Sequence, residues 1–343
     1  MNCTSPLKRW VIGYDHTRDQ DIAKVTSFKT EHVLDLGGHV VDKYQEIPCG
    51  KCLACRLNYS ESWAIRIMLE SKKYEHNEVL TLTYDPEHLP KVQGINRITG
   101  EQGEVCTLKP EDVQKFLKRL RKAFAAGKWG KHEFEPNDKL RFFNAGEYGE
   151  QNGRAHYHIV VFNLDVYDKE PTATSKRGNE QWTSKLIEEI WGMGRITLMP
   201  LNYETAAYVA RYIVKKQKGP GSKELYELSG QHPEYTTMSR MPGIASEYYN
   251  EKKGELYETQ KIWLQTQKKI RKVKLPRYFD KRFEIDEPEE MKRIKKQRKE
   301  LNEMRTNTIL SRTDKTREEY LKVQEENLKA RTKNLIRTLE GGD

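Results

Sequence analysis

Two histidines separated by one residue, His156 and His158, are the side chains of this chain that most directly suggest metal chemistry. They lie in a β-branched and aromatic run that ends at Phe162 and follows a turn-forming segment, which is typical of a β-strand. Because side chains alternate along a strand, both imidazoles project from one face, while Tyr157 and Ile159 face a core. The pair alone proves little, since two polar residues on a half-solvated strand give the same pattern.

A carboxylate is expected beside this pair. A second predicted strand, residues 140–149, precedes the turn, so the two stretches are expected to form a β-hairpin. With the turn centred near residues 151–152, Glu147 lies opposite His156. Two imidazoles and a carboxylate, with coordination positions left open, suit a divalent cation such as Mg²⁺ or Mn²⁺. The sequence therefore predicts a metal site formed by Glu147, His156 and His158.

Two tyrosines four residues apart, Tyr208 and Tyr212, lie on a predicted helix that ends by residues 219–221, Gly-Pro-Gly. Their spacing places both hydroxyls on one helix face, about 6 Å apart along the axis. Tyrosines at this spacing usually pack into a core. Here Lys215 and Lys216 follow one turn later and a metal-type histidine pair lies upstream, which favours tyrosine nucleophiles. Lys215 is then expected to stabilise the phenolate or the transition state.

A cluster of cysteines predicts a second metal site. Cys49, Cys52 and Cys55 are spaced three residues apart, so their thiolates can point inward around one ion. A closed structural zinc site needs a fourth ligand, for which Cys3 is the candidate, with Cys106, His39 or a nearby histidine as substitutes. The alternatives are an iron–sulfur cluster and three reduced cysteines on a loop that leads into a helix.

The composition favours a nucleic-acid partner. The chain has 343 residues, which is enough for one large or two smaller domains, and 33% of them are charged, with a net charge of +10. A basic surplus of this size favours a polyanion, nucleic acid before membrane. No apolar run of about 18 residues predicts a transmembrane helix, and the first residues lack the apolar segment of a signal peptide. We therefore expect a cytosolic protein with reduced thiols.

Helices and strands are expected to alternate around these motifs. Apolar periodicity predicts helices at residues 57–75 and 112–126, the second with a basic outer face. Runs of β-branched and aromatic residues predict strands at 79–84 and 195–199.

Three further stretches are polar. Residues 165–181 and 231–249 lack a clear apolar period and are expected to be loops. From residue 285 onward aromatic residues become rare and Lys, Arg and Glu dominate, which predicts a charged helical or partly disordered tail.

Taken together, these motifs resemble the replication initiators of gokushovirus-type Microviridae phages, within the His-hydrophobe-His endonuclease superfamily. The resemblance covers most of residues 1–283 and excludes the tail. Ala245 departs from the family pattern, where glycine is frequent, but it lies in a loop away from the chemistry. The motifs that carry the resemblance are residues 48–56 (PCGKCLACR), 80–85 (LTLTYD), 146–149 (GEYG), 156–158 (HYH), 208–215 (YVARYIVK) and 239–244 (SRMPGI).

The resemblance implies an α+β fold whose core is an antiparallel sheet of about five strands flanked by helices. The strand that contains Leu80 would be central and next to the histidine strand. Together with the composition, this predicts a Cys-rich segment at residues 1–60, an endonuclease domain at 61–284 and the charged tail at 285–343.

The resemblance also implies rolling-circle replication. A single-stranded phage origin would be nicked, and the protein would remain on the 5′ phosphate through a tyrosine, in the cytoplasm of a bacterial host. The expected partners are origin DNA and the host replicative helicase, with no membrane partner. We assign DNA contacts to Arg154, Arg211 and Lys216, basic residues of the same motifs.

Two other functions fit parts of the pattern. A plasmid relaxase-like nickase would use the same chemistry, and a large helicase domain, which the sequence does not contain, would favour it. A non-catalytic, zinc-dependent nucleic-acid-binding protein would use the cysteines and the basic faces and leave the histidines structural. A covalent adduct with single-stranded DNA in Mn²⁺ would leave only the enzymes.

Overall fold

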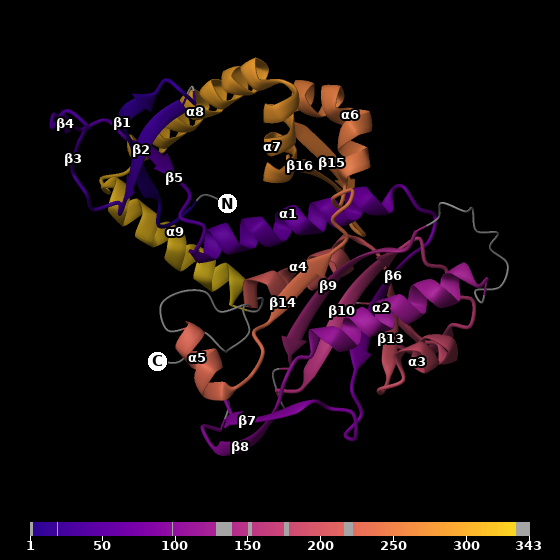
Figure 1. The fold of residues 1–343 in the computed structure, drawn as a ribbon. Coiled ribbons are helices and arrows are strands. Elements are labelled where there is room, and N and C mark those ends of the chain that lie inside the picture. The colour runs from indigo at the N-terminus through magenta and orange to yellow at the C-terminus, as the bar shows by residue number, and fades with distance from the viewer. Residues whose placement is uncertain are drawn as a thin grey trace. The chain divides into compact units, whose positions relative to one another are not determined.

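The structure is a computed structural model (Figure 1), and it describes residues 3–18, 20–97, 99–127, 139–149, 153–174, 178–215 and 222–333. The chain divides into two compact units. One consists of Met1–Asn58 with Ile294–Asp343, and the other of Tyr59–Arg293. The domain boundaries predicted after residues 60 and 284 remain predictions, because compactness does not show which part folds alone.

The larger unit is built around a seven-stranded sheet in the order β11-β12-β13-β6-β10-β9-β14, in which all paired neighbours are antiparallel. The strand that contains Leu80, β6, is the fourth of the seven and pairs with the histidine strand β10, as predicted. The α+β fold with an antiparallel sheet is therefore confirmed, with more strands than the five expected. The strands are β6 (Asn77–Thr83), β9 (Arg141–Tyr148), β10 (Ala155–Phe162), β11 (Glu170–Thr174), β12 (Glu180–Thr183), β13 (Ile196–Pro200) and β14 (Tyr235–Met238).

Two stretches predicted to be loops supply the additional strands, so those predictions were wrong. Residues 165–181 contain β11 and the start of β12, and residues 231–249 contain β14 and the start of a helix. All residues of β11 are exposed, and those of β14 are half-buried. Strands at the edges of a sheet with both faces near solvent lack the apolar alternation from which a strand is predicted.

Helices cover both faces of this sheet. Alternate residues of β10, Tyr157, Ile159 and Val161, lie in the core that contains Phe116 and Leu120 of α2, and Figure 1 shows α2 along that face. The predicted apolar face of α2 is buried as expected. On the other face α4 packs against β9 and β10. The helices of this unit are α1 (Leu53–Ser71, which begins in the smaller unit), α2 (Pro110–Ala125), α3 (Lys185–Trp191), α4 (Tyr203–Lys215), α5 (Ser222–Ser229), α6 (Ser246–Thr259) and α7 (Arg277–Asp286).

Two ribbons complete the larger unit, and the smaller unit has its own sheet. The smaller unit contains a three-stranded sheet in the order β2-β1-β5 and a ribbon of β3 and β4. The charged tail is helical over most of its described residues, as predicted. The remaining elements are β7 (Lys91–Ile95), β8 (Gln102–Cys106), β15 (Lys261–Gln265), β16 (Ile270–Lys274), β1 (Leu7–Asp15), β2 (Gln20–Thr26), β3 (Val33–Leu34), β4 (Val40–Val41), β5 (Gln45–Ile47), α8 (Pro288–Leu310) and α9 (Arg317–Thr332).

The described helices were also compared with what a bilayer requires. None of them combines the length and the apolar character that a membrane-crossing helix needs.

Gly194 fixes the chain against the end of β6 just before β13 begins. Its φ angle is 141°, and an added Cβ would lie 2.4 Å from the Thr83 carbonyl oxygen and 2.5 Å from the Asp85 amide nitrogen. We expect Gly194→Ala to lower the free energy of unfolding by about 2–4 kcal/mol, because fixed backbone atoms cannot move aside and L residues rarely adopt this φ. Chemical denaturation measures the change.

Gly103→Ala is the matched control, because a Cβ added at Gly103 meets no atom within 4 Å. Its expected effect is less than about 1 kcal/mol. Equal denaturation midpoints for the two variants would contradict the packing described for Gly194.

Candidate functional site

The hairpin of β9 and β10 has the register predicted from the sequence. His156 lies opposite Glu147, and His158 lies opposite Ala145. At the turn end, the Gly149 amide donates to the Arg154 carbonyl oxygen at 2.8 Å. The two histidines and Glu147 therefore project from one face of the sheet.

These three side chains converge on one oxygen. Glu147 Oε1 lies 2.7 Å from His156 Nε2 and 3.3 Å from His158 Nε2. One ligand atom from each residue lies within 4.8 Å of the others. Glu147 and His158 are only 2% and 3% exposed, and His156 is half-buried. The predicted metal-type group is thus assembled in the structure.

The electrostatics of Glu147 favour its ionised form. Burial by itself raises the pKa of this carboxyl, but hydrogen bonds from His156 and His158 outweigh burial and hold the pKa well below its usual range. A buried carboxylate needs a positive charge close by. Two imidazoles and a carboxylate are also the oxygen and nitrogen donors that divalent metals accept.

Helix α4 carries the two tyrosines to this group. The Asn202 side chain caps the start of the helix by accepting from the Thr205 amide at 2.9 Å. The Tyr212 ring stacks on the His158 ring, with centroids 4.5 Å apart and an interplanar angle of 1°. The Tyr208 ring meets His158 edge-on at 5.3 Å. Both tyrosines therefore contact the same histidine.

The two tyrosines differ in their surroundings. Tyr212 is 4% exposed, whereas Tyr208 is half-buried. Burial first, and then the negative charge of Glu147, raise the pKa of Tyr212 far above its usual value. The Tyr212 phenol is thus neutral at physiological pH, and Tyr208 is the more accessible of the two.

The predicted basic residues are only partly described. Arg154 donates to the Tyr84 carbonyl oxygen at 2.8 Å, and the Arg211 guanidinium lies 5.8 Å from the centre of the Tyr208 ring. Lys215 ends α4, but its side chain is outside what the structure describes, and Lys216 lies outside the described residues. The roles assigned to these four residues remain predictions.

In the smaller unit the structure brings together the four cysteines predicted to form a site. The Cys3 Sγ lies 3.6 Å from Cys49 Sγ and 3.7 Å from Cys52 Sγ, and Cys55 completes a group within 4.8 Å. With Zn–S bonds of about 2.3 Å, a tetrahedral site has sulfur–sulfur edges of about 3.8 Å. The measured separations therefore fit a single tetrahedral ion.

The neighbours of these sulfurs support the same grouping. The amide of Cys52 donates to Cys49 Sγ at 3.2 Å. The hydrogen bond that Cys3 and Cys52 share raises the pKa of Cys3 and lowers that of Cys52, so the cluster readily holds a thiolate. The predicted substitutes make other contacts: Cys106 donates to the Gly153 carbonyl oxygen, and His39 pairs with Asp35.

Comparison with known proteins identifies the family. The family model for replication-associated proteins of the ORF2 type matches residues 77–217, which include both histidines and both tyrosines. The replication-associated protein ORF2 of Spiroplasma virus 4 is 35% identical over 291 residues, which are 83% of this chain and 81% of that protein. The chain belongs to the phage replication-associated protein family. The resemblance inferred from the motifs is confirmed.

Two further relatives agree with this family. The replication-associated protein VP4 of Bdellovibrio phage phiMH2K is 29% identical over 76% of this chain and 75% of its own length. The replication-associated protein ORF4 of Chlamydia phage 1 is 31% identical over 61% of this chain and 48% of its own length. No solved structure shows a significant match to the chain.

In this replication-associated protein, each histidine is also held from behind, by contacts that sequence reasoning missed. His156 Nδ1 lies 3.1 Å from the Arg154 carbonyl oxygen, and His158 Nδ1 lies 3.0 Å from Thr81 Oγ1 of β6. A carbonyl only accepts, so His156 carries its hydrogen on Nδ1, and its Nε2 is then an acceptor facing Glu147. Two acceptors 2.7 Å apart need a proton or a metal ion, which fits the metal site.

Thr81 is therefore expected to matter for metal binding without touching the ion. Thr81→Val removes the hydroxyl that orients His158, and removal of such a partner typically weakens metal binding about 10- to 100-fold. We expect a weakening at the lower end of this range, measured as the Mn²⁺ dissociation constant by electron paramagnetic resonance.

Thr197→Val is the matched control, because Thr197 lies opposite Thr81 on β13 and forms no described hydrogen bond to either histidine. Unchanged Mn²⁺ affinity in the Thr81 variant, or an equal loss in both variants, would show that Thr81 does not position His158.

Proposed function

We propose that this chain is a rolling-circle replication initiator that nicks and rejoins single-stranded phage origin DNA through a 5′-phosphotyrosine intermediate. The observation that carries the proposal is the contact of both α4 tyrosines with His158, which shares Glu147 with His156. A nucleophile beside a metal-type group is what phosphoryl transfer to a protein side chain requires. The membership of the phage replication-associated family supports the same reading.

The residues have distinct parts in the proposed reaction. A tyrosine oxygen forms a bond to phosphorus while the bond from phosphorus to the 3′ oxygen breaks, and the tyrosine proton replaces that bond on the released 3′ hydroxyl. Glu147, His156 and His158 would hold Mg²⁺ or Mn²⁺, which supplies charge neutralisation at the scissile phosphate. Lys215 and the basic residues Arg154, Arg211 and Lys216 would bind the DNA backbone or the developing charge.

The raised pKa of Tyr212 explains why help is needed. A neutral phenol is a weak nucleophile, so its proton must leave as the new bond forms. The phosphotyrosine ester keeps the energy of the broken bond, so rejoining consumes no ATP. With two tyrosines at one site, the first can remain esterified while the second attacks, as repeated release of unit-length circles demands.

We further propose that the four-cysteine group binds a structural zinc ion. Four sulfurs with tetrahedral spacing suit zinc and leave no position open for catalysis. The proposed partners are origin DNA and the host replicative helicase, in the host bacterial cytoplasm. The relatives' role in phage replication favours this biology over plasmid transfer.

The tyrosine variants test the proposed reaction. We expect the Tyr208→Phe/Tyr212→Phe double variant to form no covalent adduct with an origin strand in Mn²⁺, on a denaturing gel. Each single variant is expected to keep some nicking, with the larger loss in Tyr208→Phe because Tyr208 is more accessible, and neither is expected to release closed circles.

Tyr203→Phe is the control on the same helix, since the Tyr203 hydroxyl accepts from Arg271 and not from the histidine group. Mass mapping of the DNA-linked peptide identifies the nucleophile. An adduct formed by the double variant would refute the tyrosine assignment, and normal circle release by either single variant would leave a mechanism with one nucleophile.

Metal analysis tests the cysteine site. Protein purified without added metal is expected to contain one zinc ion per chain, and Cys3→Ser is expected to lower this content because only three thiolates remain. Cys106→Ser, which removes a thiol outside the group, is expected to retain the ion. Folded protein without zinc, or with iron and sulfide in its place, would overturn the assignment.

A further inference from the structure

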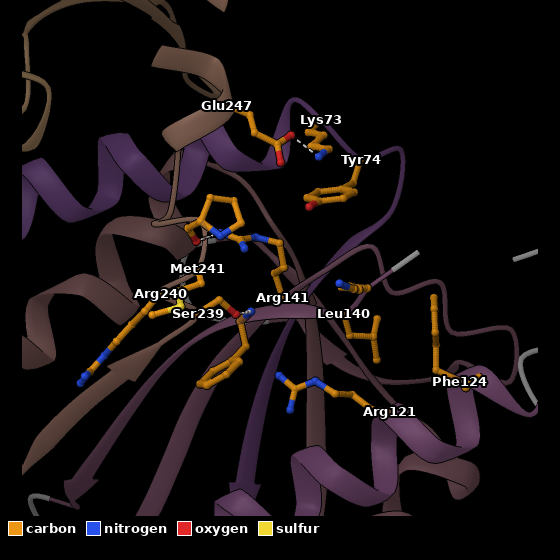
Figure 2. A pocket seen from close by; sticks show the side chains of 14 residues that line it. Lys73, Tyr74, Arg121, Phe124, Leu140, Arg141, Ser239, Arg240, Met241 and Glu247 are labelled. Carbon is orange, nitrogen blue, oxygen red and sulfur yellow. Dashed lines mark hydrogen bonds and ion pairs between the residues drawn. The ribbon is translucent and has the colours of Figure 1, made fainter. Parts of the chain in front are cut away.

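A cavity of about 750 Å³ lies at the start of β9, at the opposite end of that strand from Glu147 (Figure 2). Its walls come from the residues that follow α1, the last turn of α2, the first residues of β9 and the segment 239–242. The volume falls within the range of roughly 300–1,000 Å³ that is usual for small-ligand sites. The cavity is therefore large enough for one nucleotide.

The lining is strongly basic, but part of its charge is already used within the protein. Five of the lining side chains are lysine or arginine, and one is a carboxylate, Glu247. Lys73 pairs with Glu247, and Arg141 pairs with the buried carboxylate of Glu70 and donates to the Pro242 carbonyl oxygen. Figure 2 shows the pair of Lys73 and Glu247 at one rim. These two cations hold the walls together.

The other three cations are available to a ligand. Arg121, Lys139 and Arg240 form no ion pair with any residue that the structure describes, and all three are exposed. They come from α2, the approach to β9 and the loop after β14, so three separate segments bring positive charge to one cavity. Such convergence favours an anion with several charged oxygens.

The cavity also offers aromatic surface beside the charge. The Arg121 guanidinium lies 5.4 Å from the centre of the half-buried Phe142 ring, and half-buried Tyr74 adds a second ring to the wall. Rings and arginine planes next to phosphate-binding cations are the surface on which single-stranded nucleic acid binds, through base stacking and backbone contacts. A free phosphate would leave the rings unused.

We propose that this cavity binds one nucleotide of a single DNA strand, with its base against Phe142 and Arg121 and its backbone near Lys139 and Arg240. The proposal rests on the proposed function, since it assigns a second contact to the same single-stranded substrate. Phe142 and Glu147 are five residues apart on β9, or about 17 Å along the strand. The cavity therefore holds the DNA away from the cut and does not take part in the chemistry.

Binding without nicking tests this contact. The probe is a fluorescent DNA strand of about 20 nucleotides, longer than the roughly 4–16 that one single-strand-binding module covers. With EDTA present, anisotropy is expected to show about a 10-fold weaker affinity for Arg121→Ala/Arg240→Ala. The slope of log affinity against log salt is expected to be shallower by about 0.7 for each phosphate that is no longer neutralised. Phe142→Leu is expected to weaken binding about 5-fold or more, because the base can no longer stack on an aromatic ring.

Lys115→Ala/Lys122→Ala is the charge-matched control, because both lysines are exposed on α2 and neither lines the cavity. It is expected to bind within about 2-fold of the parent protein. An equal loss in both double variants would mean a diffuse basic surface and would overturn the proposal, as would parental affinity in the Arg121→Ala/Arg240→Ala protein.

Photocrosslinking keeps the test independent of folding defects and of nicking. A strand that contains 5-bromodeoxyuridine is expected to crosslink to the parent protein in peptides that contain residues 139–142 or 239–242, and crosslinks exclusively elsewhere would refute the cavity. Loss of nicking in the tyrosine variants with these crosslinks retained supports the cavity separately. Normal nicking with no crosslink here removes the cavity and leaves the proposed function standing.

Discussion

The pairing of β10 with β9 on one side and β6 on the other is the constraint on which the histidine site depends. A slip of one residue would turn His156 and His158 into the α2 core and move Tyr157 into the site. The core prevents this slip, because Tyr157 and Ile159 are fully buried there. The Tyr157 hydroxyl also bonds Tyr84 and the backbone of Lys109. Apolar packing on one face thus determines the chemistry on the other.

Burial of charge connects this register to the proposed reaction. An unpaired buried carboxylate costs several kcal/mol, so Glu147 is stable only with positive charge or metal beside it. The Nδ1 contacts of both histidines direct their Nε2 atoms toward Glu147, and the rings of Tyr208 and Tyr212 close the other side of His158. One compact group therefore combines an ion-binding site with two nucleophile candidates.

The two metal-type groups are assembled by different means. Three of the four cysteines lie within seven consecutive residues, where Gly50, with a φ of 73°, allows the tight turn. Only Cys3 comes from a distant part of the chain. The histidine group instead depends on strand pairing in the larger unit. Loss of one group is therefore expected to leave the other in place, which lets structure and catalysis be tested separately.

Short-range patterns in the sequence were sufficient for most of the candidate site. Alternation along a strand and counting through a turn predicted the group of Glu147, His156 and His158, helical spacing predicted the shared face of Tyr208 and Tyr212, and cysteine spacing predicted the cluster. These inferences hold because backbone geometry alone relates residues a few positions apart.

Tertiary structure decided the rest. The polar edge strands β11 and β14 have no apolar period, so only their backbone pairing reveals them. The bond from Thr81 to His158, the stacking of Tyr212 on that ring and the cavity beside Phe142 join segments far apart in the chain. Local sequence carries no signal for such contacts, because the packing of the whole sheet and its helices determines which distant residues meet.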